Sequence, residues 1–309
     1  MTNKNTLPLV TLAMVTYNSE KYVKIAIDSV LASDYTNFEL IIFDDCSSDC
    51  TWEIIQSYED SRIRKFRNLK NKGEYPNRNE CINLALGEYF IFIDGDDYIY
   101  PHGIQHFVNG SLLNSDAAMI ISRPESDHMI YPVCLTPDQV FKYDYLGNGL
   151  TSQGFPSTMF KTSCLKTEKL SISYIAGDGH IKKTLAYKHQ TILIHCGVAW
   201  WRRTPGQASE KLFKTVEGVI ESHNVNSLFL NKYKLQYLSK AETQQAEKRL
   251  MKPIFRKLIK LILAFRFNEC LILFKKTAVD LRLFKSVFYK HKQLYQVANS
   301  VNPLNSIYD

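Results

Sequence analysis

The sequence predicts an α/β protein, with a mostly parallel sheet flanked by helices and a helical extension towards the C-terminal end. Three observations predict this class. Continuous apolar segments of strand length alternate with helical segments over the first part of the chain, polar clusters follow three of the apolar segments, and the last third is basic with helical spacing of its apolar residues. Continuous apolar strands separated by helices are typical of a parallel sheet that is covered on both faces.

The expected strands are short segments rich in β-branched and aromatic residues. In chain order they cover residues 9–16, 38–43, 63–66, 89–93, 117–122 and 191–199. Three of them end in polar residues, which are Thr16, Tyr17 and Asn18 after the first, Asp44 and Asp45 after the second, and Asp94, Gly95, Asp96 and Asp97 after the fourth. Ligands of parallel sheets bind at the carboxyl ends of the strands, so we expect these clusters to form one site.

The expected helices lie between and after these strands. They cover residues 19–32, 51–58, 76–86, 102–114, 178–188, 211–232 and 240–296. Ser19 and Asp49 are expected to cap the first two helices at their N-termini, and Gly87 is a C-cap signal for the third. The rest of residues 123–210 is expected to be irregular.

Composition excludes several classes. The chain has 309 residues, of which 45% are hydrophobic and 22% charged, as in ordinary globular proteins rather than disordered or fibrous ones. Seven scattered cysteines without CxxC pairs disfavour a disulfide framework and a zinc finger, and favour a reducing cytoplasm. We see no export signal, and no uninterrupted apolar stretch of about 18 residues that would span a membrane.

The net charge of +7 divides unevenly along the chain. Residues 1–210 carry 20 basic and 24 acidic side chains, and residues 211–309 carry 18 and 7. We therefore expect two domains with a boundary near residue 210. The basic helices fit either an amphipathic region on an anionic membrane surface or a subdomain that packs on the first domain or on a second copy. Nucleic-acid binding is disfavoured because no reading motif is present.

The acidic cluster that follows residues 89–93 indicates a metal. Three carboxylates within four residues repel one another unless a cation or strong hydrogen bonds neutralise them. Oxygen ligands favour Mg²⁺ or Mn²⁺, which bind phosphate oxygens as well. The alternative is a solvated Asp-Gly turn.

Phosphate would have to be neutralised without a glycine-rich cradle. Neither a GxGxxG nor a GxxxxGK[ST] sequence is present. Lys72 and Arg78 are candidates for this task, although ordinary surface charge is the simpler reading of Lys72. The carboxylates of Asp44 and Asp45 are able to accept hydrogen bonds from a base or a ribose, or to serve only in helix capping and turn formation.

Taken together, these residues resemble glycosyltransferase family 2, which has the GT-A nucleotide-sugar fold, a Rossmann-like α/β architecture. The resemblance extends from about residue 9 to 209. Its matching pieces are VTYN at 15–18, DDCSSD at 44–49, NKG at 71–73 with RN at 78–79, GEY at 87–89 and DGDD at 94–97.

The resemblance implies roles for the nucleotide-sugar site. Thr16, Tyr17 and Asn18 would line the nucleotide pocket. Asp45, with Asp44 beside it, would recognise the base, which is uracil in most relatives.

The resemblance also implies the metal site. Asp94, Gly95 and Asp96 correspond to the DxD motif of the family. Asp94 would reach the ribose or the metal, and Asp96 would bind the metal that bridges the diphosphate. Asp97 would orient acceptor groups.

The catalytic base of inverting members lies before a helix, in an acidic pair. Asp178 occupies that position, although Gly177 stands where the preceding acidic residue is usual, and an N-cap is the alternative role of Asp178. Arg202 and Arg203 are candidates for the diphosphate, with surface charge as the alternative. Thr204 stands where many relatives have a histidine.

These roles imply an inverting, metal-dependent hexosyl- or N-acetylhexosaminyltransferase. Its donor would be a UDP-sugar, and its acceptor a glycan or lipid-linked glycan of a bacterial surface polysaccharide such as capsule or lipopolysaccharide. We expect a cytoplasmic protein, peripheral on the inner membrane face or dimeric through its basic helices. The alternatives are a catalytically inactive scaffold of the same fold and, less in keeping with residues 16–19, a nucleotidyltransferase.

Overall fold

The computed structural model describes residues 7–124, 129–173, 177–202, 215–277 and 279–288. Its main feature is an eight-stranded sheet with strand order β3-β2-β1-β4-β8-β6-β9-β7. The strands in chain order are β1 (Val10–Thr16), β2 (Phe38–Asp44), β3 (Ile63–Arg67), β4 (Tyr89–Asp94), β6 (Met119–Arg123), β7 (Val133–Leu135), β8 (Thr158–Lys161) and β9 (Thr191–His195). Two short strands, β5 (Tyr98–Ile99) and β10 (Ala199–Trp200), form a second, antiparallel sheet.

The large sheet is mostly parallel, which confirms the predicted fold class. Strand β1 pairs in parallel with β2 and β4, β2 with β3, and β6 with β9. Strand β8 lies between β4 and β6 and is antiparallel to both. We expected no strand there, because four residues without a flanking helical pattern carry little signal, and the pairing partners decide the structure.

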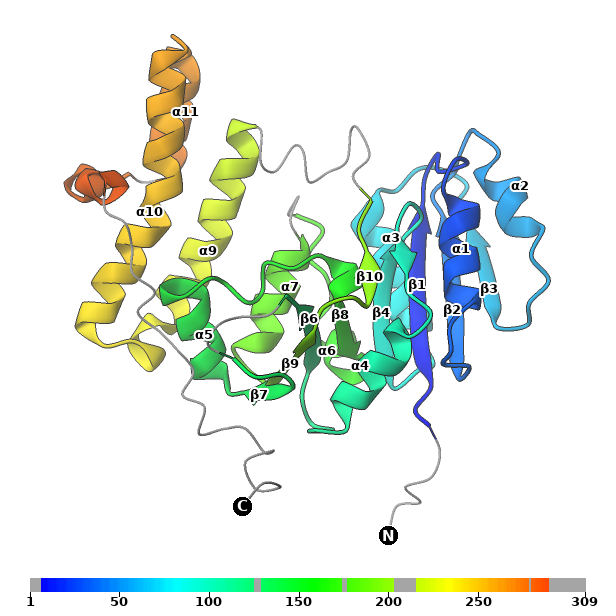
Figure 1. The fold of residues 1–309 in the computed structure, drawn as a ribbon. Helices are drawn as coiled ribbons and strands as arrows, with labels where there is room; N and C mark the ends of the chain where they lie inside the picture. Colours follow the sequence, from blue (N-terminus) through cyan, green and yellow to red (C-terminus); the bar gives the residue numbers. More distant parts are fainter. Residues whose placement is uncertain (1–6, 125–128, 174–176, 203–214, 278, 289–309) are drawn as a thin grey trace, which may run out of the picture.

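Two apolar clusters cover opposite faces of the sheet (Figure 1). One face packs against α3 (Glu74–Leu84), α5 (Pro137–Leu146), α6 (Thr162–Glu168) and α7 (Gly177–Ala186). The other packs against α1 (Val23–Leu31), α2 (Thr51–Gln56) and α4 (Gly103–Ser111). Successive residues of β1 alternate between the clusters, with Leu12 in one and Ala13 in the other, as the period of two of a strand requires.

Several local predictions were wrong. Helices α5 and α6 lie in the region expected to be irregular. The N-cap of α1 is Tyr22 rather than Ser19. The C-cap of α3 is Ala85 rather than Gly87, which instead lies so close to β1 that a Cβ there would be 2.5 Å from the amide nitrogen of Thr11. Close packing, and not helix termination, therefore explains this glycine.

The C-terminal helices are α9 (Val216–Tyr237), α10 (Lys240–Leu263), α11 (Phe267–Lys276) and the 3₁₀ segment η2 (Leu281–Phe288). Helix α9 and the start of α10 pack into the core of the first sheet face, to which Phe229 and Tyr233 belong. The later part of α10 forms a small separate cluster with α11 and the start of α9, centred on Phe255 and Leu273. None of the described helices is both long and apolar enough to cross a membrane. All seven cysteines are free thiols.

Candidate functional site

The polar ends of β1, β2 and β4 meet at one edge of the sheet, as predicted. Thr16 lies opposite Asp44 in the β1–β2 register, and Val15 lies opposite Asp94 in the β1–β4 register. The turn after β4 packs directly on β1, because a Cβ at Gly95 would lie 2.8 Å from Cγ2 of Thr16. Only glycine permits this approach without a shift of the neighbouring side chain.

The carboxylate of Asp45 is held by the loop that precedes α3. It accepts hydrogen bonds from the backbone amides of Lys72 at 2.9 Å and Gly73 at 2.8 Å, and from Nδ2 of Asn68 at 2.8 Å. Burial alone would raise the pKa of Asp45, but these hydrogen bonds, together with one from Asn77, lower it below its ordinary value. Asp45 is therefore an ionised acceptor in a fixed orientation.

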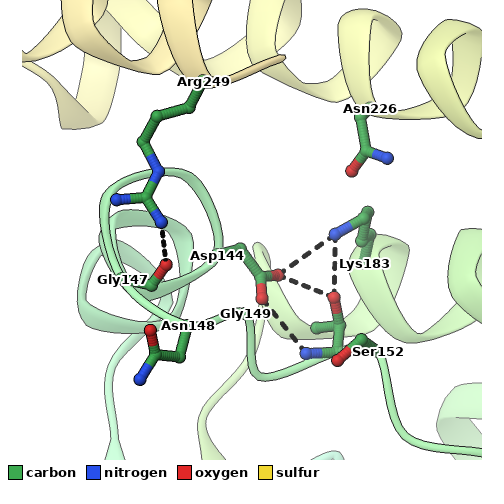
Figure 2. A pocket seen from close by; sticks show the side chains of 9 residues that line it. Asp144, Gly147, Asn148, Gly149, Ser152, Lys183, Asn226 and Arg249 are labelled. Atoms are coloured by element: carbon green, nitrogen blue, oxygen red, sulfur yellow. Dashed lines mark hydrogen bonds and ion pairs between the residues drawn. The ribbon is translucent and has the colours of Figure 1, made fainter. Parts of the chain in front are cut away.

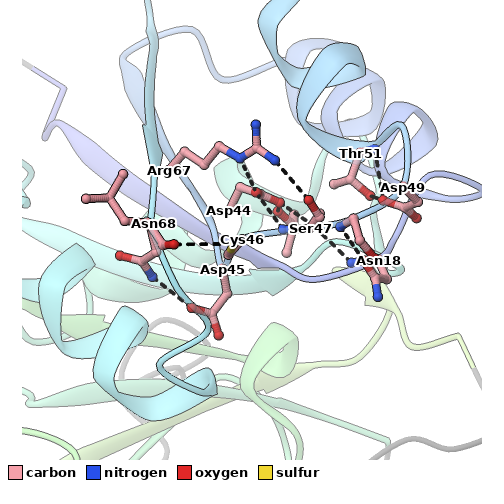
Figure 3. Close-up of polar contacts among 12 residues, drawn as sticks. Asn18, Asp44, Asp45, Cys46, Ser47, Asp49, Thr51, Arg67 and Asn68 are labelled. Atoms are coloured by element: carbon pink, nitrogen blue, oxygen red, sulfur yellow. Dashed lines mark hydrogen bonds and ion pairs between the residues drawn. The ribbon is translucent and has the colours of Figure 1, made fainter.

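Asp44 has a different role from its neighbour. Its side chain is fully buried and accepts hydrogen bonds from the Ser47 amide and hydroxyl and from Thr16, with Arg67 at 3.4 Å (Figure 3). Asp45 is almost as buried, with 2% of its surface exposed, so burial alone does not tell the two carboxylates apart. The hydrogen bonds of Asp44 position the loop that follows β2, and its predicted part in base recognition stays a prediction.

The residues after β1 form a bridge to the same loop. The Asn18 amide donates to the Ser47 hydroxyl at 3.0 Å, and Oδ1 of Asn18 accepts from the Ser48 amide at 2.9 Å (Figure 3). Asn18 has a φ of 48°, a conformation that asparagine tolerates better than most residues. Tyr17 and Asn18 are both exposed, so this segment offers surface to a ligand.

The two predicted phosphate ligands on the loop and helix α3 differ sharply in burial. Lys72 is exposed. Arg78 is 1% exposed and pairs with Asp94 and with Glu74, the latter at 2.9 Å. A guanidinium enclosed in this way cannot reach a phosphate in solvent, so the prediction for Arg78 is corrected to an orienting role for Asp94.

The turn after β4 gathers more negative charge than its neighbours neutralise. Burial raises the pKa of Asp94 despite the opposing charge of Arg78. Burial and the charge of Asp94 raise the pKa of Asp97 to about 8. Oδ2 of Asp97 is buried and has no hydrogen-bond partner within the described residues. A cation at this turn would offset the clustered negative charge of Asp94 and Asp97 and would give the unpartnered Oδ2 of Asp97 an interaction.

The donor chemistry of the turn fits a hard divalent cation. Asp94 and Asp96 supply only oxygen atoms, the preferred ligands of Mg²⁺ and Mn²⁺. No group of three or more His, Cys, Asp or Glu side chains is arranged to hold a metal ion in the part of the chain that the structure describes. Mg²⁺ is usually bound by one or two carboxylates and completes its shell with water and substrate phosphate.

Arg202 contacts this turn although it lies 105 residues after Asp97 in the chain. The pairing of β10 with β5 brings it there, and its Nε donates to the Asp96 carbonyl at 2.8 Å while its amide donates to Oδ1 of Asp97 at 3.0 Å. The guanidinium stacks on Tyr22 and Trp200, at 4.7 and 4.6 Å from their ring centres. Arg203 and Thr204 lie outside the described residues.

Asp178 lies in the first turn of α7, next to a tight contact. The Gly177 amide donates to the Tyr75 hydroxyl at 2.8 Å, and a Cβ at position 177 would lie 2.6 Å from Cε1 of Tyr75. The ring of Tyr75 therefore occupies the space that an acidic side chain at position 177 would need. This explains the departure from the acidic pair in physical terms.

Lys182 is a residue of this site that sequence reasoning missed. It is fully buried, and its Nζ lies 3.6 Å from Oδ2 of Asp178 without a hydrogen-bond partner. Phe155 separates it from Arg78, with the two cations at 5.9 and 4.7 Å from the ring centre. The i,i+4 spacing to Asp178 was the available signal, but a helical lysine is exposed far more often than buried.

A polar cavity of about 460 Å³ lies elsewhere, between the first domain and the C-terminal helices (Figure 2). It contains none of the predicted site residues and is lined by Asp144, Gly147, Asn148, Gly149, Thr151, Ser152, Lys183, Asn226 and Arg249. The buried carboxylate of Asp144 accepts from Lys183 at 3.2 Å and from the hydroxyls of Thr151 and Tyr187 at 2.7 Å each. This cluster ties the loop after α5 to α7.

We expect the Asp144 cluster to make stability depend on acid. Burial alone would raise the pKa of Asp144, but Lys183 and the hydrogen bonds lower it, so its contribution is present above its unfolded pKa of about 3.9 and is lost as the pH falls through the folded value. Asp144→Asn should cost about 3–5 kcal/mol at pH 7, because Lys183 loses its counter-charge. Urea unfolding at neutral and acidic pH checks this. Asp116→Asn, at an exposed position, is the control, and a loss that is equal at every pH would contradict the prediction.

Comparison with known proteins gives first the fold of this chain and then a family match. The sheet and its flanking helices have the GT-A architecture of two solved glycosyltransferases. Staphylococcus aureus TarS 1–349 in complex with UDP-GlcNAc matches with a TM-score of 0.64 and 18% identity over 90% of this chain and 81% of that one. The mannosyltransferase PcManGT from Pyrobaculum calidifontis, in complex with GDP-Man and Mn²⁺, matches with a TM-score of 0.61 and 14% identity over 92% and 87%. Residues 11–149 match the model described as Glycosyl transferase family 2, so this segment has the sequence of a domain of that family.

Curated relatives match over shorter segments. Poly(ribitol-phosphate) beta-N-acetylglucosaminyltransferase TarS of S. aureus is 29% identical over 183 residues, which cover 57% of this chain and 28% of TarS. UDP-Glc:alpha-D-GlcNAc-diphosphoundecaprenol beta-1,3-glucosyltransferase WfaP of Escherichia coli is 39% identical over 92 residues, 30% of this chain and 37% of WfaP. The matches span well under half the length of these relatives.

Proposed function

We propose that the protein is an inverting, metal-dependent glycosyltransferase that moves a sugar from a UDP-sugar to a hydroxyl group of a glycan or lipid-linked glycan. The observation that carries the proposal is the meeting of Thr16, Asp45 and the acidic turn after β4 at one sheet edge, with Arg202 against the same turn. The match of residues 11–149 to the glycosyl transferase family 2 model supports the reaction class.

Each group at the edge has a chemical task in this proposal. Asp45 accepts a hydrogen bond from the base, for which its ionised state and fixed loop prepare it. Asp94 and Asp96 would hold a divalent cation, which would supply positive charge against the departing nucleoside diphosphate. Arg202 holds the acidic turn in place, and its cationic head lies beside the same charge.

Asp178 is the proposed general base. It removes the proton from the acceptor hydroxyl as that oxygen attacks the anomeric carbon, and the single displacement inverts the configuration. Its partly exposed position at the start of α7 leaves it open to an acceptor. No covalent intermediate is needed.

Relatives suggest where the product belongs. The name of TarS describes transfer of N-acetylglucosamine to poly(ribitol-phosphate), and that of WfaP transfer of glucose to a diphosphoundecaprenol-linked sugar. We extend this to the present chain as synthesis of a bacterial surface polysaccharide.

The proposal is tested by hydrolysis of a panel of nucleotide sugars in the presence of Mn²⁺ or Mg²⁺. We expect UDP release from at least one donor, and a loss of at least about 100-fold in Asp96→Asn, since even an outer-shell partner of a metal ligand is worth about 10–100-fold. Asp116→Asn, with an exposed side chain, should match the parent. A scaffold protein would release no UDP from any donor, and an unchanged rate in Asp96→Asn would reject the metal role.

A further inference from the structure

The segment from the end of α10 through α11 to η2 exposes many large apolar side chains. Nine large apolar residues of this region are exposed to solvent: Ile262, Leu263, Phe265, Phe267, Leu271, Ile272, Phe274, Leu281 and Phe284. Ile262, Leu263, Phe265 and Phe267 surround the turn between the two helices, and we name these four residues the apolar tip. Leu263 is 74% and Phe265 80% exposed. Contiguous exposed apolar residues mark an interaction surface.

The backbone of the turn holds these side chains outward. The Phe265 amide donates to the Ile262 carbonyl and the Arg266 amide to the Leu261 carbonyl, at 3.0 and 2.9 Å, which closes α10 with a Schellman motif. This motif places Phe265 at a φ of 56°, a position that glycine usually occupies. An aromatic residue there gains nothing for the local backbone, and its ring contacts the ring of Phe267, with 6.3 Å between the ring centres.

Charge identifies the chemistry of that contact. Residues 256–284 contain seven basic and two acidic side chains. The two acidic ones, Glu269 and Asp280, already pair with Arg266 and Arg282. Among the described residues, four exposed cations make no ion pair: Arg256, Lys260, Lys275 and Lys276. Two copies of such a patch would repel each other, whereas an anionic surface complements it.

We propose that the apolar tip enters the interface of an anionic lipid bilayer, with the four cations at the level of the headgroup phosphates. Aromatic residues among cations are typical of segments that lie in this interface. The tip points to the same end of the molecule as the carboxyl end of β1 (Figure 1). The sheet edge with the candidate site therefore faces the lipid surface, where a lipid-linked acceptor would present its sugar. Binding to lipid itself does not depend on the proposed function.

Vesicle sedimentation of the full chain tests this proposal. We expect binding to phosphatidylcholine vesicles that contain phosphatidylglycerol, weak binding to phosphatidylcholine alone, and loss of binding with added salt. Phe265→Ser/Phe267→Ser should weaken binding at least about tenfold through lost apolar burial. Lys275→Gln/Lys276→Gln should weaken it about 25-fold, since each charge near such a surface is worth about fivefold.

The matched control is Leu112→Ser/Leu235→Ser, which alters two equally exposed leucines away from the tip. It should bind vesicles as the parent does. Equal binding by the tip variant, or no binding of the parent to anionic vesicles, would overturn the proposal. So would a dimer in sedimentation velocity that the tip variant converts to monomer, because the occupant would then be a second copy. UDP release in lipid-free buffer should be unchanged in the tip variant, so failure here is distinct from failure of the proposed function.

Discussion

Replacing Asp178 by Asn is expected to lower the rate of sugar transfer about 10²–10⁴-fold, which is the usual contribution of a positioned general base. Binding of UDP should persist, because the groups proposed to hold it lie on other elements, at the ends of β1, β2 and β4. Transfer kinetics with a donor found in the nucleotide-sugar panel, together with calorimetric titration of UDP, measure both expectations.

The same substitution is also expected to destabilise the protein. Lys182 is fully buried, and Asp178 is the carboxylate nearest to its ammonium group, at 3.6 Å. Removal of one partner leaves an uncompensated buried charge, which costs about 3 kcal/mol at the lower end of the usual range, because Asp178 is itself partly exposed. A lower rate of sugar transfer in Asp178→Asn alone would therefore have two causes, the loss of the general base and partial unfolding.

The double variant Asp178→Asn/Lys182→Met separates the two effects. Replacement of a buried charged pair by groups of similar volume is often neutral or stabilising, so this variant should melt near the parent temperature and still fail to transfer sugar. Lys182→Met alone serves as the matched control and should retain Asp178 as a base. If the double variant folds like the parent and transfers sugar at the parental rate, the base lies elsewhere.

Arg78→Met is expected to destabilise the protein strongly, with a loss of about 3–5 kcal/mol in the free energy of unfolding. Burial alone would lower the pKa of Arg78, but the charges of Asp94 and Glu74 raise it above its usual value, so the guanidinium is firmly charged. Its loss would leave Asp94 next to Asp97, whose pKa is already raised. Hydrolysis of the donor should fall with it, because Asp94 loses the group that orients it.

Urea unfolding and UDP release measure these two effects. Arg78→Lys keeps the charge but loses the planar fork that reaches two carboxylates, so its values should lie between those of the parent and Arg78→Met. Lys24→Met removes one partner of an exposed pair with Asp28 and should change the unfolding free energy by less than about 1 kcal/mol. A similar loss of unfolding free energy in Arg78→Met and Lys24→Met would show that the buried ion pairs of Arg78 stabilise the protein no more than the exposed pair does.

Local sequence accounts for the part of the site that lies on β1, β2 and β4. Each strand is a continuous apolar segment that stops at a polar residue, and parallel pairing then brings their ends together without further information. The prediction that these three ends meet is confirmed by the register of Thr16 with Asp44 and of Val15 with Asp94. The roles of Asp45, Asp96 and Asp178 in binding and catalysis stay predictions.

What the sequence determined by itself is the alternation of strands and helices and the placing of acidic residues at strand ends, because both follow from patterns within a few neighbouring residues. Only the tertiary structure decided which partners each charged group has. Lys72 and Arg78 are both basic residues within a short stretch of sequence, yet one is exposed and the other is enclosed with Asp94. The Tyr75 ring excludes a side chain at position 177, and β10 delivers Arg202 to the acidic turn. These outcomes depend on burial and on contacts between residues far apart in the chain, 102 positions for Tyr75 and Gly177, and no local pattern encodes them.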